Sequence, residues 1–319
     1  MVENTNCCEL GAYLRLHRAK PGEWAAALHS LTRGGETRLS AERAHLSGHC
    51  LAELSTRLGS VMYFWAEGGL RLSGRKGPWY TLALIQNGDV EMATDEGSLG
   101  PSPQLLMLPP DSPVDLSLQA GFRGLVIQLP PHLLTQIRMP TPVMQHGLRP
   151  WLEHYLFESQ FFLDHGHAIA ETERLLRRLL DALNEGVVAP APPPRQLDRR
   201  VLRAIDKMRH DRNWEFQLAD LASCAGVSER NLYYLMKAHT GMTPYRFHQR
   251  CRLIRVRQRL VDCQCATVHI SRYASDEGFA HPGRFAALYR EHFGELPRQT
   301  VQIRRALLER VAPLEALAG

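Results

Sequence analysis

The sequence lacks the long apolar run that a membrane-spanning helix requires. No stretch of the chain approaches about 18 consecutive apolar residues, and the first residues show neither the basic nor the apolar segment of a secretory signal. Cysteine is scarce: the seven cysteines are an odd number without CxxC spacing, which favours reduced thiols. We therefore expect a cytoplasmic protein that does not contact a membrane.

Proline concentrates at one place and divides the chain. Residues 190–194 contain four prolines in five positions; each locks φ and removes a backbone donor, so no helix can continue through them. A length of 319 residues allows two domains, at about 100–200 residues each. We expect a first domain at 1–186, a linker at 187–196, a second domain at 197–303 and a tail at 304–319.

The two domains differ in charge. From Arg195 onward the chain has 22 Lys and Arg against 13 Asp and Glu, a balance of +9, whereas residues 1–194 hold 16 basic and 20 acidic residues, a balance of −4. A basic back half favours a polyanionic partner. Ordinary solvated surface charge is the alternative.

The front of the chain, to about residue 145, has the pattern of a β-barrel or sandwich. Short apolar runs are separated by Gly and Pro turn signals, and Asn87-Gly88 between two such runs predicts a hairpin. The expected strands cover residues 61–65, 80–85, 105–108, 114–118 and 124–129.

Helical periodicity replaces this pattern at about 149–186. A leucine stripe recurs at i, i+3/i+4 and i+7/i+8, and it predicts an amphipathic helix within a helical pair. The stripe packs either on the barrel of its own chain or on a second subunit, in which case the pair dimerises. Its members are Leu175, Leu176, Leu179, Leu180 and Leu183.

The back half is helical and contains an internal repeat. Residues 218–237 predict two short helices that meet at Gly226, which can take the left-handed turn, and Ser228, which can cap the second helix. A similar pattern returns 52–53 residues later, at Gly278, and predicts a second helix-turn-helix over 270–290.

A basic segment, 243–260, connects the two repeats. Thr243 can cap a helix and Pro244 suits its first position. About 17 helical residues span roughly 25 Å, which would set two recognition helices near the roughly 34 Å turn of B-DNA. This geometry favours DNA over another acidic partner. Some of the segment's arginines are expected to be structural, their stems covering apolar surface.

Residues 197–300 resemble the AraC/XylS family of bacterial transcription regulators. The matching residues keep the family's order and spacing: Leu221-Ala222, Ala225-Gly226-Val227-Ser228, Leu232, Gly241-Met-Thr-Pro244, Arg252-Leu253, Ala274, Gly278-Phe279, Phe285 and Phe293-Gly294-Glu-Leu-Pro297. The front resembles the family's cupin-like effector-binding domains. The resemblance implies an α+β protein: a cupin-like barrel with a helical hairpin, joined to two helix-turn-helix motifs.

The same resemblance implies a homodimer that binds direct repeats in promoter DNA, recruits RNA polymerase and responds to a small organic effector. We expect a transcription activator, not an enzyme, with no cofactor. Two alternatives stay open: control by a protein partner, and a cupin-type enzyme. The chain departs from the family at Val256, at Ala280, Pro282, Gly283 and Ala287 of the second motif, and at Thr300 and Val301.

Because of these departures, we expect the first motif to make most of the contacts with DNA bases, and the second to contact phosphates and fix the register on the duplex. Arg230 can bond the O6 and N7 atoms of guanine; Tyr233 and Tyr234 match further contact positions, unless they pack against the connecting helix. Lys237 suits a phosphate. His281 and Arg284 are the polar residues at the start of the second recognition helix, although His281 is equally well explained as a turn residue.

Sites for small ligands are less marked. Tyr63, Trp65, Trp79 and Tyr80 are candidate effector-binding residues, unless they simply fill the barrel. His45-x3-His49-Cys50, Cys263-x-Cys265 and His165-x-His167 have metal-like spacings without a second pair of ligands, so we expect no metal site. No nucleophile elbow, phosphate loop or dinucleotide fingerprint is present.

Overall fold

The front half is built from two antiparallel sheets. The computed structural model describes residues 9–20, 22–24, 26–27, 36–41, 49–88, 90–94, 97–98, 104–137, 140–193, 195–263 and 268–309. One sheet has six strands in the order β1 (Leu14–Ala19), β3 (His49–Thr56), β4 (Gly59–Trp65), β11 (Arg123–Leu129), β6 (Tyr80–Asn87) and β9 (Leu105–Leu108). The other has five, in the order β2 (Glu36–Ala41), β5 (Leu70–Arg75), β10 (Pro113–Leu118), β7 (Val90–Thr94) and β8 (Gly97–Ser98).

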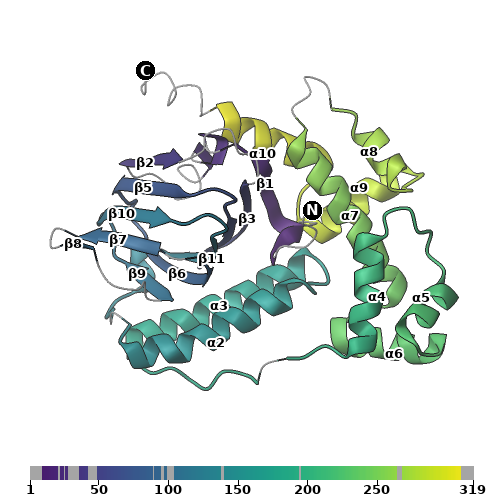
Figure 1. Ribbon diagram of the computed structural model, residues 1–319, viewed down its shortest axis with the longest axis horizontal. Coiled ribbons are helices and arrows are strands. Elements are labelled where there is room, and N and C mark those ends of the chain that lie inside the picture. The colour runs from purple at the N-terminus through teal and green to yellow at the C-terminus, as the bar shows by residue number, and fades with distance from the viewer. Residues whose placement is uncertain are drawn as a thin grey trace.

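The two sheets face each other and enclose an apolar interior (Figure 1). Alternate residues of each strand point to opposite faces, so Met62 and Phe64 of β4 join Leu70, Val114 and Leu116 of the opposite sheet in one buried cluster. Tyr63, between Met62 and Phe64, belongs instead to the cluster on the outer face of the six-stranded sheet. The expected cupin-like barrel is confirmed.

The hairpin predicted at Asn87-Gly88 is wrong. β6 and β7 flank this turn, but β6 pairs with β11 and β9, whereas β7 pairs with β10 and β8 in the other sheet. Gly88 does adopt a positive φ of 85°, which glycine tolerates. The local signal therefore marks the turn correctly, and the partner of the next strand is decided by packing across the barrel.

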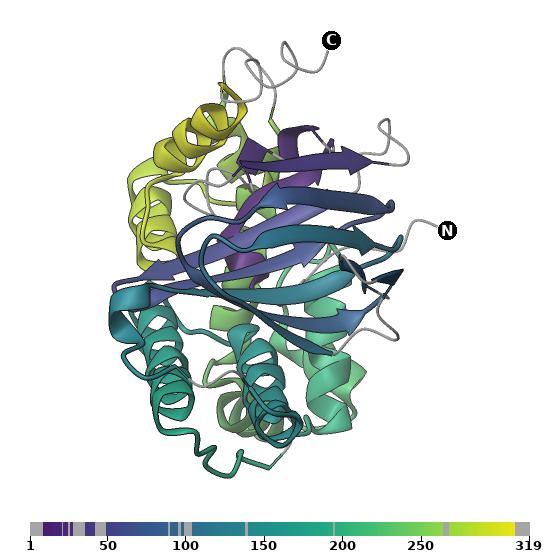
Figure 2. The ribbon, with the colours of Figure 1, turned by 90° about the vertical axis from the view of Figure 1, so that its left-hand side faces the viewer.

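Two helices cover the outer face of the six-stranded sheet: α2 (Pro142–Ser159) and α3 (His165–Glu185) (Figures 1 and 2). The leucine stripe of α3 is buried in the cluster that contains Leu82, Leu125 and Ile127 of the sheet. Of the two alternatives for this stripe, packing on the barrel of its own chain is confirmed. The solvent-facing side of α3 carries ion pairs such as Arg177–Glu173.

The back half is helical. Beyond an irregular segment after Gly186, the chain forms α4 (Arg199–His210), α5 (Leu218–Ala225), α6 (Glu229–Thr240), α7 (Pro244–Asp262), α8 (Ile270–Asp276), α9 (Pro282–Phe293) and α10 (Pro297–Glu309). α10 continues past residue 303, where the second domain was expected to end, because Leu307 is buried against the barrel. Within the described residues, no helix is long and apolar enough to cross a membrane.

The helical half packs directly on the barrel. α7 and α10 lie against β1, the edge strand of the six-stranded sheet, and α9 lies against α3 (Figure 1). Leu253, Val256 and Phe293 of the helical half share a single buried cluster with the barrel and its helices. The two halves are therefore joined by a continuous apolar interface as well as by the proline-rich connection.

Candidate DNA-binding surface and barrel cavity

The first helix-turn-helix is formed by α5 and α6. Gly226 ends α5 at a positive φ of 73°, and the Ser228 hydroxyl accepts a bond of 3.3 Å from the Asn231 amide to begin α6. Leu221 and Leu232 are fully buried between the helices. The turn glycine, the N-cap and the core thus have the roles that the sequence predicted, and they fix which face of α6 meets solvent.

That solvent-facing side of α6 carries four predicted contact residues: Arg230, Tyr233, Tyr234 and Lys237 are all exposed. Tyr233 and Tyr234 are 39% and 58% exposed, so they do not pack into the linker helix as the alternative proposed. The Arg230 guanidinium lies 5.8 Å from the Tyr234 ring centroid, and the two tyrosine rings meet edge-on at 6.0 Å. Arginine donors and aromatic faces therefore form one open cluster suited to base edges and phosphates.

The second helix-turn-helix, α8 and α9, repeats the first. Gly278 adopts a φ of 74° in its turn, as Gly226 does in the first motif. His281 occupies the N-cap position of α9 without a side-chain cap, and His281 and Arg284 are both exposed. The face of α9 beside them presents Gly283 and Ala287, so it offers fewer polar groups than α6.

α7 connects the two motifs, and three of its six arginines are buried. Arg250 donates to the Gln160 carbonyl at 2.8 Å, Arg255 pairs with Glu277 at 2.7 Å and Arg257 pairs with Glu295 at 2.9 Å. All three arginines are buried. The structural role expected for some of the arginines is thus visible at these positions, and the phosphate-facing charge of the helix is smaller than its composition indicates.

One buried polar network joins α7 to the barrel. Arg257 is 1% exposed; its Nε and Nη2 donate to the Leu14 carbonyl of β1 at 3.2 and 3.1 Å. Glu295 also pairs with Arg15 of β1 at 2.8 Å, and it accepts a bond of 2.6 Å from Thr300. Burial by itself would raise the pKa of Glu295, but Arg257 and Arg15 outweigh it and lower this pKa to about 2.

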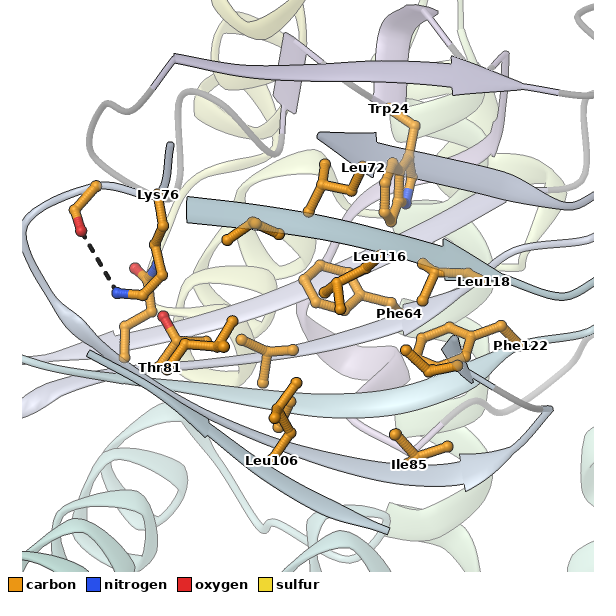
Figure 3. A pocket seen from close by; sticks show the side chains of 17 residues that line it. Trp24, Phe64, Leu72, Lys76, Thr81, Ile85, Leu106, Leu116, Leu118 and Phe122 are labelled. Carbon is orange, nitrogen blue, oxygen red and sulfur yellow. Dashed lines mark hydrogen bonds between the residues drawn. The ribbon is translucent and has the colours of Figure 1, made fainter. Parts of the chain in front are cut away.

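A cavity of about 120 Å³ lies between the two sheets (Figure 3). Apolar side chains from both sheets line most of it, among them Phe64, Leu72 and Leu116. Lys76, Thr81 and Gln128 are the polar side chains of its lining. Burial lowers the pKa of Lys76 to about 8, although Asp111 opposes this shift, so the ammonium form prevails at neutral pH.

The four aromatic residues expected at an effector site lie elsewhere. Tyr63 is buried on the outer face of the six-stranded sheet, and Trp65 and Tyr80 pack against the same cluster. The backbone carbonyl of Trp79 accepts a bond from Lys76. None of the four side chains lines the cavity. Strand alternation alone could not have told which face of β4 points inward, because Tyr63, Phe64 and Trp65 are all large and aromatic.

The metal-like spacings gain no support from the structure. Among the described residues, no three His, Cys, Asp or Glu side chains are grouped closely enough to hold a metal ion. His45 and Cys265 lie outside the described residues. His167 is used structurally instead: its Nδ1 accepts a bond of 3.2 Å from the Leu163 amide before α3.

Comparison with known proteins identifies the helical half. Residues 221–303, which contain both motifs, match the model of a helix-turn-helix domain family, HTH_18. A XylDLEGF operon transcriptional activator of Pseudomonas putida is 26% identical over 235 residues, 67% of this chain and 69% of the relative. The helical half therefore contains a helix-turn-helix domain of the AraC type. Such relatives are transcription regulators and not enzymes.

Two other regulators match different shares of this chain. The transcriptional activator RhaS of Escherichia fergusonii is 31% identical over 143 residues, 44% of this chain and 49% of RhaS. Among solved structures, the AraC-like transcriptional activator CuxR is 14% identical, with a TM-score of 0.35 over 73% of this chain and 89% of CuxR. The AraC-type helix-turn-helix domain implies DNA binding, and α6 and α9 are the second helices of its two motifs.

Proposed function

We propose that the protein is a sequence-specific transcription activator that a small organic effector controls through the barrel. The observation that carries the proposal is the exposed row of Arg230, Tyr233, Tyr234 and Lys237 on α6, the second helix of a helix-turn-helix. Its curated relatives include transcription activators. The protein acts where the chromosome is, in the cytoplasm.

The two motifs divide the work. Arg230 bonds a guanine edge, the two tyrosines pack on base methyls or bond phosphates, and Lys237 binds phosphate. His281, at the N-cap of α9, and Arg284 of α9 contact the phosphate backbone of the DNA and fix the register of the protein on the duplex. α7 has 19 residues and spans about 28 Å at 1.5 Å per residue. In Figure 1 the motifs lie one above the other along α7, on the side away from the sheets.

The effector acts through the interface between the halves. Leu307 of α10 belongs to the same buried cluster as Phe64 and Leu116, which line the cavity. A ligand that repositions these side chains favours one arrangement of α10 and α7 over another. The position of the second motif changes with that arrangement. Bound DNA must then change the affinity for the effector by the same factor by which bound effector changes the affinity for DNA.

Dimerisation and recruitment of RNA polymerase complete the proposal. The dimer binds direct repeats of a half-site in promoter DNA. Its interface uses a surface other than the leucine stripe of α3, since that stripe is buried in its own chain. Light scattering of the full chain on a DNA duplex with one or two half-sites measures the stoichiometry: two chains per tandem site are expected, and one chain per tandem site would exclude the dimer.

Selection from random duplexes tests the DNA-binding function itself. The full chain should enrich a defined sequence and bind it at least about 10³-fold more tightly than random duplex at physiological salt. Equal affinity for selected and random duplex would show that the basic half binds DNA only through its charge. Control by a protein partner would instead require that no small molecule in the barrel alters DNA affinity.

A further inference from the structure

The turns of the two helix-turn-helix motifs are held by the same pair of backbone bonds. In each motif the amide of the turn glycine donates to the carbonyl three residues earlier, and the next amide donates to the carbonyl five residues before it. These amides belong to Gly226 and Val227 in the first motif and to Gly278 and Phe279 in the second. Neither bond uses the carbonyl of the residue just before the glycine, which lies at the C-terminal end of the first helix.

An arginine from a third helix binds that carbonyl in the first motif. Arg203 of α4 donates from Nη2 to the Ala225 carbonyl at 2.6 Å. The same nitrogen would lie 3.4 Å from a Cβ at Gly226, so the guanidinium covers the turn glycine. Val201 and Ile205 of α4 share the buried cluster of α5 and α6, so α4 supports the motif (Figure 1). A cation at the C-terminal end of a helix also interacts favourably with the helix dipole.

The second motif has the same arrangement, with α7 in the place of α4. Arg252 donates from Nε to the carbonyl of Glu277, the residue just before Gly278. A Cβ at Gly278 would overlap the Arg252 guanidinium, which also lies 5.2 Å from the ring centroid of Phe279. Arg255 of the same helix pairs with the Glu277 carboxylate at 2.7 Å. α7 is thus the supporting helix of the second motif as well as the connection between the motifs.

From this repeated arrangement we infer that Arg203 and Arg252 are positioning residues for DNA recognition: each closes the turn of one motif and so sets the direction of the helix that follows. The inference rests on the proposed DNA-binding function and names two residues that act through α6 and α9. The structural repeat is therefore three helices long, α4 to α6 and α7 to α9. The two arginines stand at different distances from their glycines in the sequence, so the offset of 52–53 residues does not reveal them.

The turn controls the base contacts because the contact residues follow it closely. Arg230 and Arg284 both lie in the first turn of their helices, α6 and α9. Groups that bind a ligand must be held within about 0.5 Å of the productive geometry, and a turn that opens moves both guanidinium groups directly. Loss of a positioning arginine should therefore lower the sequence-specific part of the affinity and preserve the general attraction to phosphates.

Anisotropy titrations of the full chain with selected and random duplexes test the inference. Arg203→Met keeps the stem and removes the donors; it should lower the affinity for the selected duplex at least about fivefold and the affinity for random duplex less than about twofold. Arg203→Lys keeps a charged donor and should stay within about twofold of the unaltered chain. Arg199→Met removes an exposed arginine of the same helix; it is the matched control and should resemble the unaltered chain. An equal loss in Arg203→Lys and Arg203→Met, or no loss in either, would overturn the inference.

Footprinting on the selected duplex shows which motif each arginine positions. Arg203→Met should weaken the protection given by the first motif alone, and Arg252→Met the protection given by the second alone. Equal weakening of both protected patches by each variant would show that the arginines do not act on separate motifs, and the inference would fail.

Amide hydrogen exchange without DNA separates this inference from the proposed function. Arg203→Met should speed exchange at Gly226 and Val227 and leave the second turn unchanged, and Arg252→Met should do the reverse. Unchanged exchange at both turns overturns the inference alone, even in a chain that selects a DNA sequence. Faster exchange throughout the helical half would mean that the arginine holds the fold rather than the turn, and it overturns the inference as well. The expected local changes in a chain without any sequence preference overturn the proposed function alone.

Discussion

Replacing Glu295 by glutamine tests whether the buried network between α7 and β1 holds the two halves together. Glu295 faces Arg257 at 2.9 Å and Arg15 at 2.8 Å, and it is 9% exposed. Glutamine keeps the shape and removes the charge. Two buried or half-buried guanidinium groups then lose their shared anion, which is the costly kind of change in a buried ion pair.

The expected magnitude follows from the pKa of Glu295, which is lowered from 4.5 to about 2. A lowering of this size corresponds to about 3 kcal/mol of stabilisation of the charged form. This agrees with the roughly 3–5 kcal/mol lost when one partner of a buried pair is removed. At pH 7 we therefore expect Glu295→Gln to lower the free energy of unfolding by about 3 kcal/mol.

The effect should depend on pH in a defined direction. Because the folded pKa lies below the unfolded one, the stabilisation is fully present above the unfolded value and is lost as the pH falls toward about 2. By pH 3.5 about 1 kcal/mol of it should be gone. The difference between the unaltered chain and Glu295→Gln should therefore shrink to about 2 kcal/mol at that pH.

Urea denaturation at pH 7 and pH 3.5 measures both quantities. Glu153→Gln is the control, because Glu153 forms an exposed i,i+4 pair with Arg149 on α2, and such pairs contribute about 0.3–0.5 kcal/mol. A loss of unfolding free energy below about 1 kcal/mol for Glu295→Gln, or a loss that does not change with pH, would refute the electrostatic reasoning. The apolar contacts alone would then hold the two halves together.

Three further outcomes are expected. Arg230→Ala should reduce the discrimination at one base pair by about 1–3 kcal/mol, whereas Lys237→Ala should lower the affinity for selected and random duplexes alike and reduce the salt slope by about one. Anisotropy titrations at several salt concentrations measure both effects. An equal loss of affinity for both duplexes in Arg230→Ala would contradict the role of Arg230. Leu179→Ala should cost about 2–5 kcal/mol of stability in urea denaturation without changing the oligomeric mass in light scattering; a change in mass would place the stripe in a subunit interface. Gly226→Ala, at a φ of 73°, should cost about 1 kcal/mol in the same denaturation assay, and no loss would mean that the turn relaxes freely.

The helical half was largely predictable because its signals are local. Gly226 and Gly278 end helices with positive φ, and Ser228 and Thr243 cap the next ones through their own side chains. Each role depends on a few neighbouring residues, so spacing in the sequence identifies it. The exposure of Arg230 and Tyr234 then followed from the burial of Leu232 on the opposite side of α6.

The barrel cavity and the interface were not predictable in this way. Lys76 and Gln128 lie about fifty residues apart in the sequence and meet only through the pairing of β6 with β11 and the crossing between sheets. The sequence predicts that arginines of α7 face DNA. Arg257 is instead buried by β1 and Glu295, which come from opposite ends of the chain. Packing between residues far apart in the sequence decides both features, and composition does not predict such contacts.

Hydroxyl-radical footprinting of the full chain on its selected duplex tests the central claim, that two motifs on one helix read DNA together. The account predicts two protected patches for each half-site, about 10 base pairs apart on one face of the duplex. Arg230→Ala should weaken one patch, and Arg284→Ala the other. A single patch per half-site that Arg284→Ala leaves unchanged would contradict the account.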